Sequence, residues 1–232
     1  MIVSVHIADI GWLRAPRVLL KRPRTASVPG LTYAEPVTTA PITSRMLPRP
    51  SPGRVGLIAA WEDDSAIDGF LAEHPLAQRL APGWRVRLQP LRVFGSWAGM
   101  PDLPSRELAV EDDEPVVVLT LGRLRLSRAL PFLRSAAAAE RAAINDRAMV
   151  ASTGLARPPH LVSTFSVWRD AAAMRRYAFS QSGAHQAAVK ADRRRPYHHE
   201  SAFIRFRPYA SEGTWDGCDP LAALAPASAA PT

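Results

Sequence analysis

The chain contains an internal repeat, and this repeat restricts its possible folds more than any other feature. Residues 86–90 read Val-Arg-Leu-Gln-Pro, and residues 204–208 read Ile-Arg-Phe-Arg-Pro. A Gly-Ser/Thr-Trp-x-Gly motif follows each copy, at 95–99 and at 213–217. In both copies the glycine comes five positions after the proline, and the tryptophan comes two positions after the glycine. The identical spacing predicts that the chain consists of two copies of one structural unit.

Each half of the sequence predicts the same order of elements, βαββαβ. Alternation of apolar and polar residues, as in Val3, Val5 and Ile7, is typical of a half-buried strand. We predict strands at 2–9, 31–39, 55–61 and 84–94 with helices at 12–22 and 65–80, then strands at 116–121, 149–155, 161–168 and 201–208 with helices at 128–143 and 171–191. Asp64 or Ser65 is expected to cap the helix at 65–80.

The predicted fold class is α+β, with two tandem ferredoxin-like βαββαβ repeats that form a pseudo-dimeric α+β barrel. One such repeat leaves one face of its sheet bare, and a second copy can cover that face. The expected organisation is a first repeat at 1–98, an acidic, proline-rich linker at 99–115, a second repeat at 116–218 and a disordered tail at 219–232. Two repeats linked side by side are the alternative.

Composition excludes several classes of protein. No apolar run reaches the roughly 20 residues of a membrane-spanning helix, and the N-terminus lacks the features of a signal peptide. The single cysteine, Cys218, excludes an internal disulfide and favours the reducing cytoplasm. The net charge of +8 comes from scattered arginines, and the one dense run, Arg193–Arg195, has no aromatic residues interleaved with it. We therefore expect no nucleic-acid partner.

The histidines are the remaining candidates for chemistry, because the common phosphate-binding, nucleophile and metalloprotease motifs are absent. His185 falls late in the second helix of the longer copy, where a neutral imidazole can serve as the axial ligand of a haem; a surface histidine is the alternative. If Val3, Val5 and Ile7 face the helices, His6 points into the barrel, as a donor to substrate or oxygen or as a satisfied core histidine. His198 and His199 are expected to form a polar loop end.

Several segments are similar to the spheroidene monooxygenase family. The likeness is specific in the second half, at Ser163–Trp168, at Ala173–Phe179 with Gly183–His185, and at Glu200–Arg207 with Glu212–Trp215. In the first half it is fainter and lies at Val3–Asp9 and Gly56–Trp61. The resemblance implies oxygenation of an apolar carotenoid on a tandem ferredoxin-like barrel, with haem as cofactor.

This resemblance leads to a working hypothesis with named roles. His185 would bind the haem iron, and Arg205 or Arg87, which are repeat equivalents, would pair with a haem propionate; a repeated surface or inter-strand salt bridge is their alternative. The expected partners are a small apolar substrate, molecular oxygen and an electron donor, with room for a transient contact with a membrane surface. The chain is expected to be a monomer or a homodimer. A cofactor-free binding or scaffold barrel and a cofactor-independent oxygenase are the competing functions.

Overall fold

The structure is a computed structural model that describes residues 1–42, 49–105, 108–144, 146–179 and 196–224. Its elements follow the predicted order twice. The first repeat contains β1 (Ile2–Asp9), α1 (Ala15–Leu20), β2 (Leu31–Ala40), β3 (Arg54–Trp61), α2 (Asp64–Glu73), α3 (Pro75–Leu80) and β4 (Trp84–Gly95). The second contains β5 (Val116–Leu124), α4 (Ala129–Ile144), β6 (Met149–Arg157), β7 (Leu161–Trp168), α5 (Ala171–Phe179) and β8 (His198–Glu212). Three short 3-10 helices, η1 (Thr25–Ser27), η2 (Leu126–Arg128) and η3 (Ala222–Leu224), lie between or after them.

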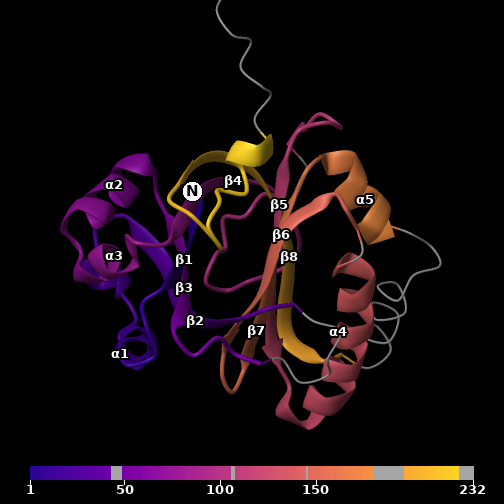
Figure 1. The fold of residues 1–232 in the computed structure, drawn as a ribbon, viewed down its shortest axis with the longest axis horizontal. Coiled ribbons are helices and arrows are strands. Elements are labelled where there is room, and N and C mark those ends of the chain that lie inside the picture. The colour runs from indigo at the N-terminus through magenta and orange to yellow at the C-terminus, as the bar shows by residue number, and fades with distance from the viewer. Residues whose placement is uncertain (43–48, 106–107, 145, 180–195, 225–232) are drawn as a thin grey trace, which may run out of the picture.

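The eight strands form one closed antiparallel barrel in the order β1-β3-β2-β6-β7-β5-β8-β4. The two repeats meet at two seams, a long one between β4 and β8 and a short one where Thr38–Ala40 pairs with Gly154–Ala156. Helices α1, α2 and α3 cover the first repeat, and α4 and α5 flank the second on the opposite side (Figure 1). The prediction of a pseudo-dimeric α+β barrel is confirmed, and the side-by-side alternative is wrong.

The inside of the barrel is an apolar core shared by both repeats. Val3, Val5 and Ile7 of β1 belong to one buried cluster that includes Leu119 of β5 and Phe206 of β8. Because inner side chains come from both half-sheets, neither repeat can bury its inner face alone. None of the helices in the described part of the chain is long and apolar enough to span a bilayer.

The predicted orientation of β1 is wrong. Val3, Val5 and Ile7 face the interior, so Ser4 and His6 point outward, toward α2, where the ring of Phe70 lies 6.3 Å from that of His6. The alternation along β1 correctly shows which residues share a face. Because both faces are buried, it does not show which face turns into the barrel. The apolar set enters the barrel because the closed interior offers little to pair with a polar group, whereas outward polar groups find partners beneath the helix.

The helices differ from their predicted boundaries at identifiable residues. The predicted helix at 65–80 is interrupted at His74, whose Nδ1 accepts a hydrogen bond from the Leu76 backbone N–H (3.1 Å) and so caps α3. Asp63, rather than Asp64 or Ser65, caps α2 by accepting from the Ala66 N–H (3.0 Å). In the second repeat α5 is described to Phe179, and the rest of the predicted helix at 171–191 lies outside the described residues.

Two segments predicted to lie outside the folded repeats contribute to the core. Met100 and Leu103, from the predicted linker, are buried in the interior cluster. Residues 219–224, predicted as part of a disordered tail, pack against the barrel instead. The carboxylate of Asp219 accepts a hydrogen bond from Trp84 Nε1 (2.9 Å), and Leu221 packs against the same cluster. These contacts are not visible in the sequence because neither segment has a periodic apolar pattern.

An aromatic cluster joins the two repeats at the barrel interior. Phe165 of β7 lies 5.9 Å from Trp84 of β4 and 6.1 Å from Trp215, measured between ring centroids. All three side chains are buried. The cluster therefore ties together strands from both repeats and the segment after β8.

We predict that Phe165→Ala destabilises the protein by about 3–5 kcal/mol, because it removes a fully buried ring and leaves a cavity between the repeats. Chemical denaturation measures the loss. Phe94→Ala is the matched control, since Phe94 is 37% exposed, and it should cost less than half as much. Equal losses for the two variants would show that the interior cluster does not hold the repeats together.

Candidate functional site

The helix-facing surfaces of the two half-sheets differ in how completely they are covered. In the first repeat the outward residues Leu57, Ala59 and Trp61 of β3 are fully buried beneath the helices. In the second repeat β7 alternates up to Val167, with buried residues facing the barrel and half-buried residues, such as Thr164 and Ser166, facing out. We call the surface formed by the outward residues of β5–β8 the outer face of the second repeat. It is the more accessible of the two.

Small and hydroxyl-bearing residues line the centre of this face. Thr120 and Thr164 lie side by side on β5 and β7, with their Oγ1 atoms 2.5 Å apart. Ser166 accepts a hydrogen bond from Trp168 Nε1 (2.9 Å), and Gly154 lies beside Thr164 on β6. The side chains at the centre of this face are therefore short, and those on β7 are half-buried rather than fully covered.

The edge of the face at the β4–β8 seam combines aromatic rings with positive charge. Phe94 and Phe203 are paired across the seam with ring centroids 6.1 Å apart, and the Arg92 guanidinium lies 4.2 Å from the Phe94 centroid. Arg92 is in turn directly opposite Arg205, whose side chain is only 2% exposed. This part of the sheet thus carries two arginines in register, and a guanidinium group is the side chain best suited to bind a carboxylate.

Arg205 lies on this face because of the alternation along β8. Its neighbours Ile204 and Phe206 enter the interior core. Arg205 itself pairs in register with Val118, which belongs to a separate cluster with Ala171 and Met174 of α5. The side chain is therefore on the helix side of the sheet, as the repeat predicts from its equivalent, Arg87.

A histidine that the sequence analysis assigned to a polar loop end also lies on this face. A Cβ atom on Gly122 would meet the ring of His198 at 2.6 Å, so the absence of a side chain at Gly122 makes room for the imidazole. The ring of Phe132, from α4, lies 5.1 Å from that of His198. The sequence gives no signal for this contact, because it depends on the register between β5 and β8.

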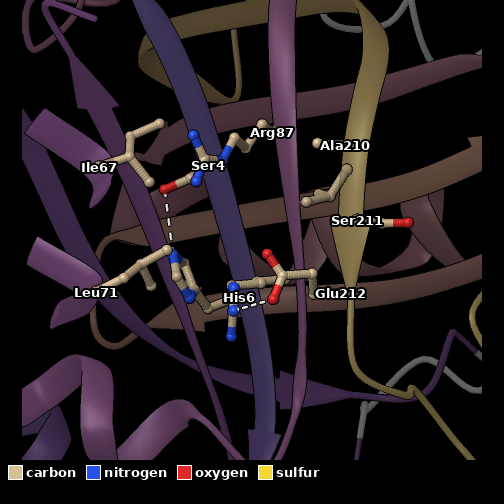
Figure 2. A pocket seen from close by; sticks show the side chains of 10 residues that line it. Ser4, His6, Ile67, Leu71, Arg87, Ala210, Ser211 and Glu212 are labelled. Carbon is tan, nitrogen blue, oxygen red and sulfur yellow. Dashed lines mark hydrogen bonds and ion pairs between the residues drawn. The ribbon is translucent and has the colours of Figure 1, made fainter. Parts of the chain in front are cut away.

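The structure separates the four residues proposed from the sequence. His6 and Arg87 lie on the outer face of the first repeat, and both line a small cavity there (Figure 2). Arg205 is on the outer face of the second repeat. His185 lies outside the described residues, so its predicted position beside a cleft stays a prediction. In the described part of the chain, no three His, Cys, Asp or Glu side chains come together as a metal site.

His6 is part of a buried hydrogen-bonded chain. Trp61 Nε1 donates to Ser4 Oγ (2.9 Å), and Ser4 Oγ lies 3.2 Å from His6 Nε2. Burial, reinforced by the positive charges of Arg85 and Arg87, lowers the pKa of His6 to about 3. The adjoining cavity has a volume of about 10 Å³, enough for one water molecule. His6 is therefore a neutral imidazole that no substrate of ordinary size reaches.

Arg87 is held in an ion-pair network with α2. Its guanidinium lies 2.8 Å from Asp64 and 2.5 Å from Asp68, and the Tyr209 hydroxyl donates to Asp64 (2.8 Å). These contacts tie β4 and β8 to the helix. They match the salt-bridge alternative for Arg87, and the network leaves its charge already compensated.

The chain is similar to three curated proteins. It is 36% identical to the spheroidene monooxygenase of Rubrivivax gelatinosus over 174 residues, covering 73% of this chain and 66% of the relative. It is 31% identical to that of Rhodobacter capsulatus over 186 residues, covering 75% of each chain. It is 29% identical to that of Cereibacter sphaeroides, covering 75% of this chain and 55% of the relative. The chain thus spans just under two thirds of the first relative and about half of the third.

Solved structures agree with the fold. An aldoxime dehydratase crystallised with butyraldoxime matches with a TM-score of 0.53 at 11% identity, over 96% of this chain and 84% of that one. At this level of identity the likeness concerns the fold alone. No protein-family model matches the chain. The identity to the Rhodobacter capsulatus protein, sustained over three quarters of both chains, places this protein in the spheroidene monooxygenase family.

Proposed function

We propose that this protein is a monooxygenase that acts on an apolar, isoprenoid-like substrate at the outer face of the second repeat. The observation that carries the proposal is the sequence identity to relatives named for oxygenation of spheroidene. In such a reaction one atom of molecular oxygen enters a C–H bond of the substrate as a hydroxyl group. The other leaves as water, with two electrons from a donor and two protons.

The outer face of the second repeat combines partly exposed aromatic rings with half-buried hydroxyl groups, which suits an apolar substrate better than the barrel interior or the sheet face beneath the helices of the first repeat. The barrel interior is filled with side chains, and the outer face of the first repeat is sealed. Phe94 and Phe203 offer partly exposed apolar surface beside the short side chains of Thr120 and Thr164. In this proposal the two rings bind the substrate chain, and the short side chains set the depth at which it lies.

The same residues are compatible with haem as the cofactor. Haem supplies a redox-active iron that can activate molecular oxygen. Arg205, buried on this face, would pair with a propionate, and the ring would lie beside the short side chains of Thr120 and Thr164. His185 remains the proposed iron ligand from the sequence. His198, whose ring lies against Gly122, is a second imidazole on the same face, within the described residues.

We predict that titration of the purified protein with hemin gives a saturable Soret band at one haem per chain. His185→Ala should abolish this band, whereas His198→Ala should retain it, with circular dichroism showing that both variants are folded. Loss of the band in His198→Ala alone would transfer the ligand role to His198. A flat spectrum in the unmodified protein would contradict the haem proposal, and oxygen consumption would then separate a cofactor-independent oxygenase from a binding barrel.

Arg205 and Arg87 form a matched pair for testing the anionic anchor. We predict that Arg205→Met weakens hemin binding at least tenfold, because a charge-assisted hydrogen bond to a carboxylate is lost. Arg87→Met should leave the affinity within about twofold, since Arg87 is committed to Asp64 and Asp68. Absorbance titration measures both. Equal effects of the two substitutions would remove Arg205 from the site.

The environment of His6 predicts a pH dependence of stability rather than a role in proton transfer. Its pKa is about 3 in the folded protein and about 6.5 when unfolded, so only the unfolded state binds a proton between these values. The stabilisation is complete above pH 6.5 and falls as the pH drops toward 3. Between pH 7.5 and 4.5 the protein should lose about 2–3 kcal/mol more than His6→Gln, as measured by urea denaturation. Parallel profiles would mean that His6 is charged in the fold.

A further inference from the structure

The segment around α1 exposes an unusual amount of apolar surface. Trp12, Leu13 and Leu20 are 67%, 68% and 81% exposed, the highest values among the large apolar residues that the structure describes. The six-residue helix is too short to bury them against itself. Large exposed apolar side chains gathered on one element mark a surface for interaction.

These side chains are presented by a firmly seated element. The backbone N–H groups of Arg14 and Ala15 both donate to the Gly11 carbonyl at 3.1 Å, so the chain turns directly into the helix. On its inner side Ala15 and Val18 are buried in the core beneath the helices of the first repeat. The opposite side must therefore point to solvent, and the exposure is a fixed property of the fold.

Positive charge accompanies the apolar side chains. Residues 10–34 carry a net charge of +5, out of +8 for the whole chain, because they contain no Asp or Glu. The basic residues, all exposed, are Arg14, Arg17, Lys21, Arg22 and Arg24. Of these five residues, only Arg22 has an ion-pair partner in the described part of the chain, Glu35 at 3.5 Å. The other four present their charges to solvent.

Cations and large apolar side chains are interleaved along α1 and the residues on either side of it. Within α1, Arg17 is three residues from Leu20, a spacing that places the two side chains next to each other on a helix, and Trp12 and Leu13 lie in the turn that leads into it. The boundary of an anionic lipid bilayer matches this arrangement, with phosphate groups for the cations and acyl chains for the tryptophan and leucines. A nucleic acid would match only the cations.

We propose that this α1 patch, made of Trp12, Leu13, Leu20, Arg14, Arg17 and Lys21, docks the protein on the surface of an anionic phospholipid bilayer. The docking is peripheral, because the apolar side chains reach only the region between head groups and acyl chains. It is independent of the proposed reaction: the patch would bind vesicles whether or not the protein is an oxygenase.

Binding of the full chain to vesicles tests the proposal. The protein should co-sediment with vesicles of phosphatidylglycerol and phosphatidylcholine, and much less with phosphatidylcholine alone. Replacing Trp12, Leu13 and Leu20 together by serine should weaken binding at least tenfold, and so should reversal of Arg14, Arg17 and Lys21 to glutamate, since each cation near such a surface contributes about fivefold. Thermal denaturation should show that both variants remain folded.

Two control substitutions match the change in chemistry but lie elsewhere. Leu108→Ser removes an exposed leucine in the acidic segment, and Arg147→Glu reverses an exposed charge in the second repeat. Both should leave vesicle binding within about twofold. If either control weakens binding as much as the patch variants do, attraction by the whole molecule, rather than the α1 patch, is responsible.

Trp12 provides a direct readout of insertion, because the other five tryptophans are buried. Vesicles with brominated acyl chains should quench part of the fluorescence of the unmodified protein and almost none in Trp12→Phe. Equal quenching in both proteins would overturn the proposal. Full vesicle binding by the serine variant would also overturn it. The same holds if the patch variants change the oligomeric state of the protein but not its binding to vesicles, or if the unmodified protein binds duplex DNA as tightly as vesicles.

Discussion

The whole structure depends on the burial of two inner sheet faces against each other. Each repeat has one sheet face covered by helices and one bare, and closing the barrel removes both bare faces from water at once. Phe165 and Trp84, one from each repeat, meet in the middle of this core. Because side chains fill the interior, a ligand can bind only at the outer faces or at the ends of the elements. That constraint decides where a function can be placed in this chain.

The two repeats divide these tasks although they derive from one pattern. In the first, a buried hydrogen-bonded chain through His6 and an ion-pair network at Arg87 seal the helix-facing side. In the second, the equivalent Arg205 lies on the same face as Thr120 and Thr164, whose short side chains contact each other. The repeat places both arginines on the helix side of their sheets, but it does not show which of them takes part in function.

The fold was predictable from the sequence because it follows from periodicity and from spacing repeated twice. The orientation of β1 was not: alternation says that Val3 and Val5 share a face, but a strand buried on both sides does not reveal which face turns inward. Met100 could not be predicted as a core residue, because the segment that contains it has no periodic pattern of apolar residues. The His198 contact with Gly122 depends on strand register and could be found only in three dimensions.

The repeat also bears on how the α1 patch would orient the molecule. Strand one of the two copies is offset by 114 residues, so Trp12 corresponds to Leu126, which is likewise exposed. A two-fold relation between the repeats, through the β2–β6 and β4–β8 seams, keeps equivalent residues at the same height along its axis, and both α1 and α4 extend into the lower half of the molecule in Figure 1. A flat surface touching both would lie across that axis. The outer face of the second repeat would then stand close to the bilayer, so an apolar molecule leaving the lipid would have a short path through water to the proposed site.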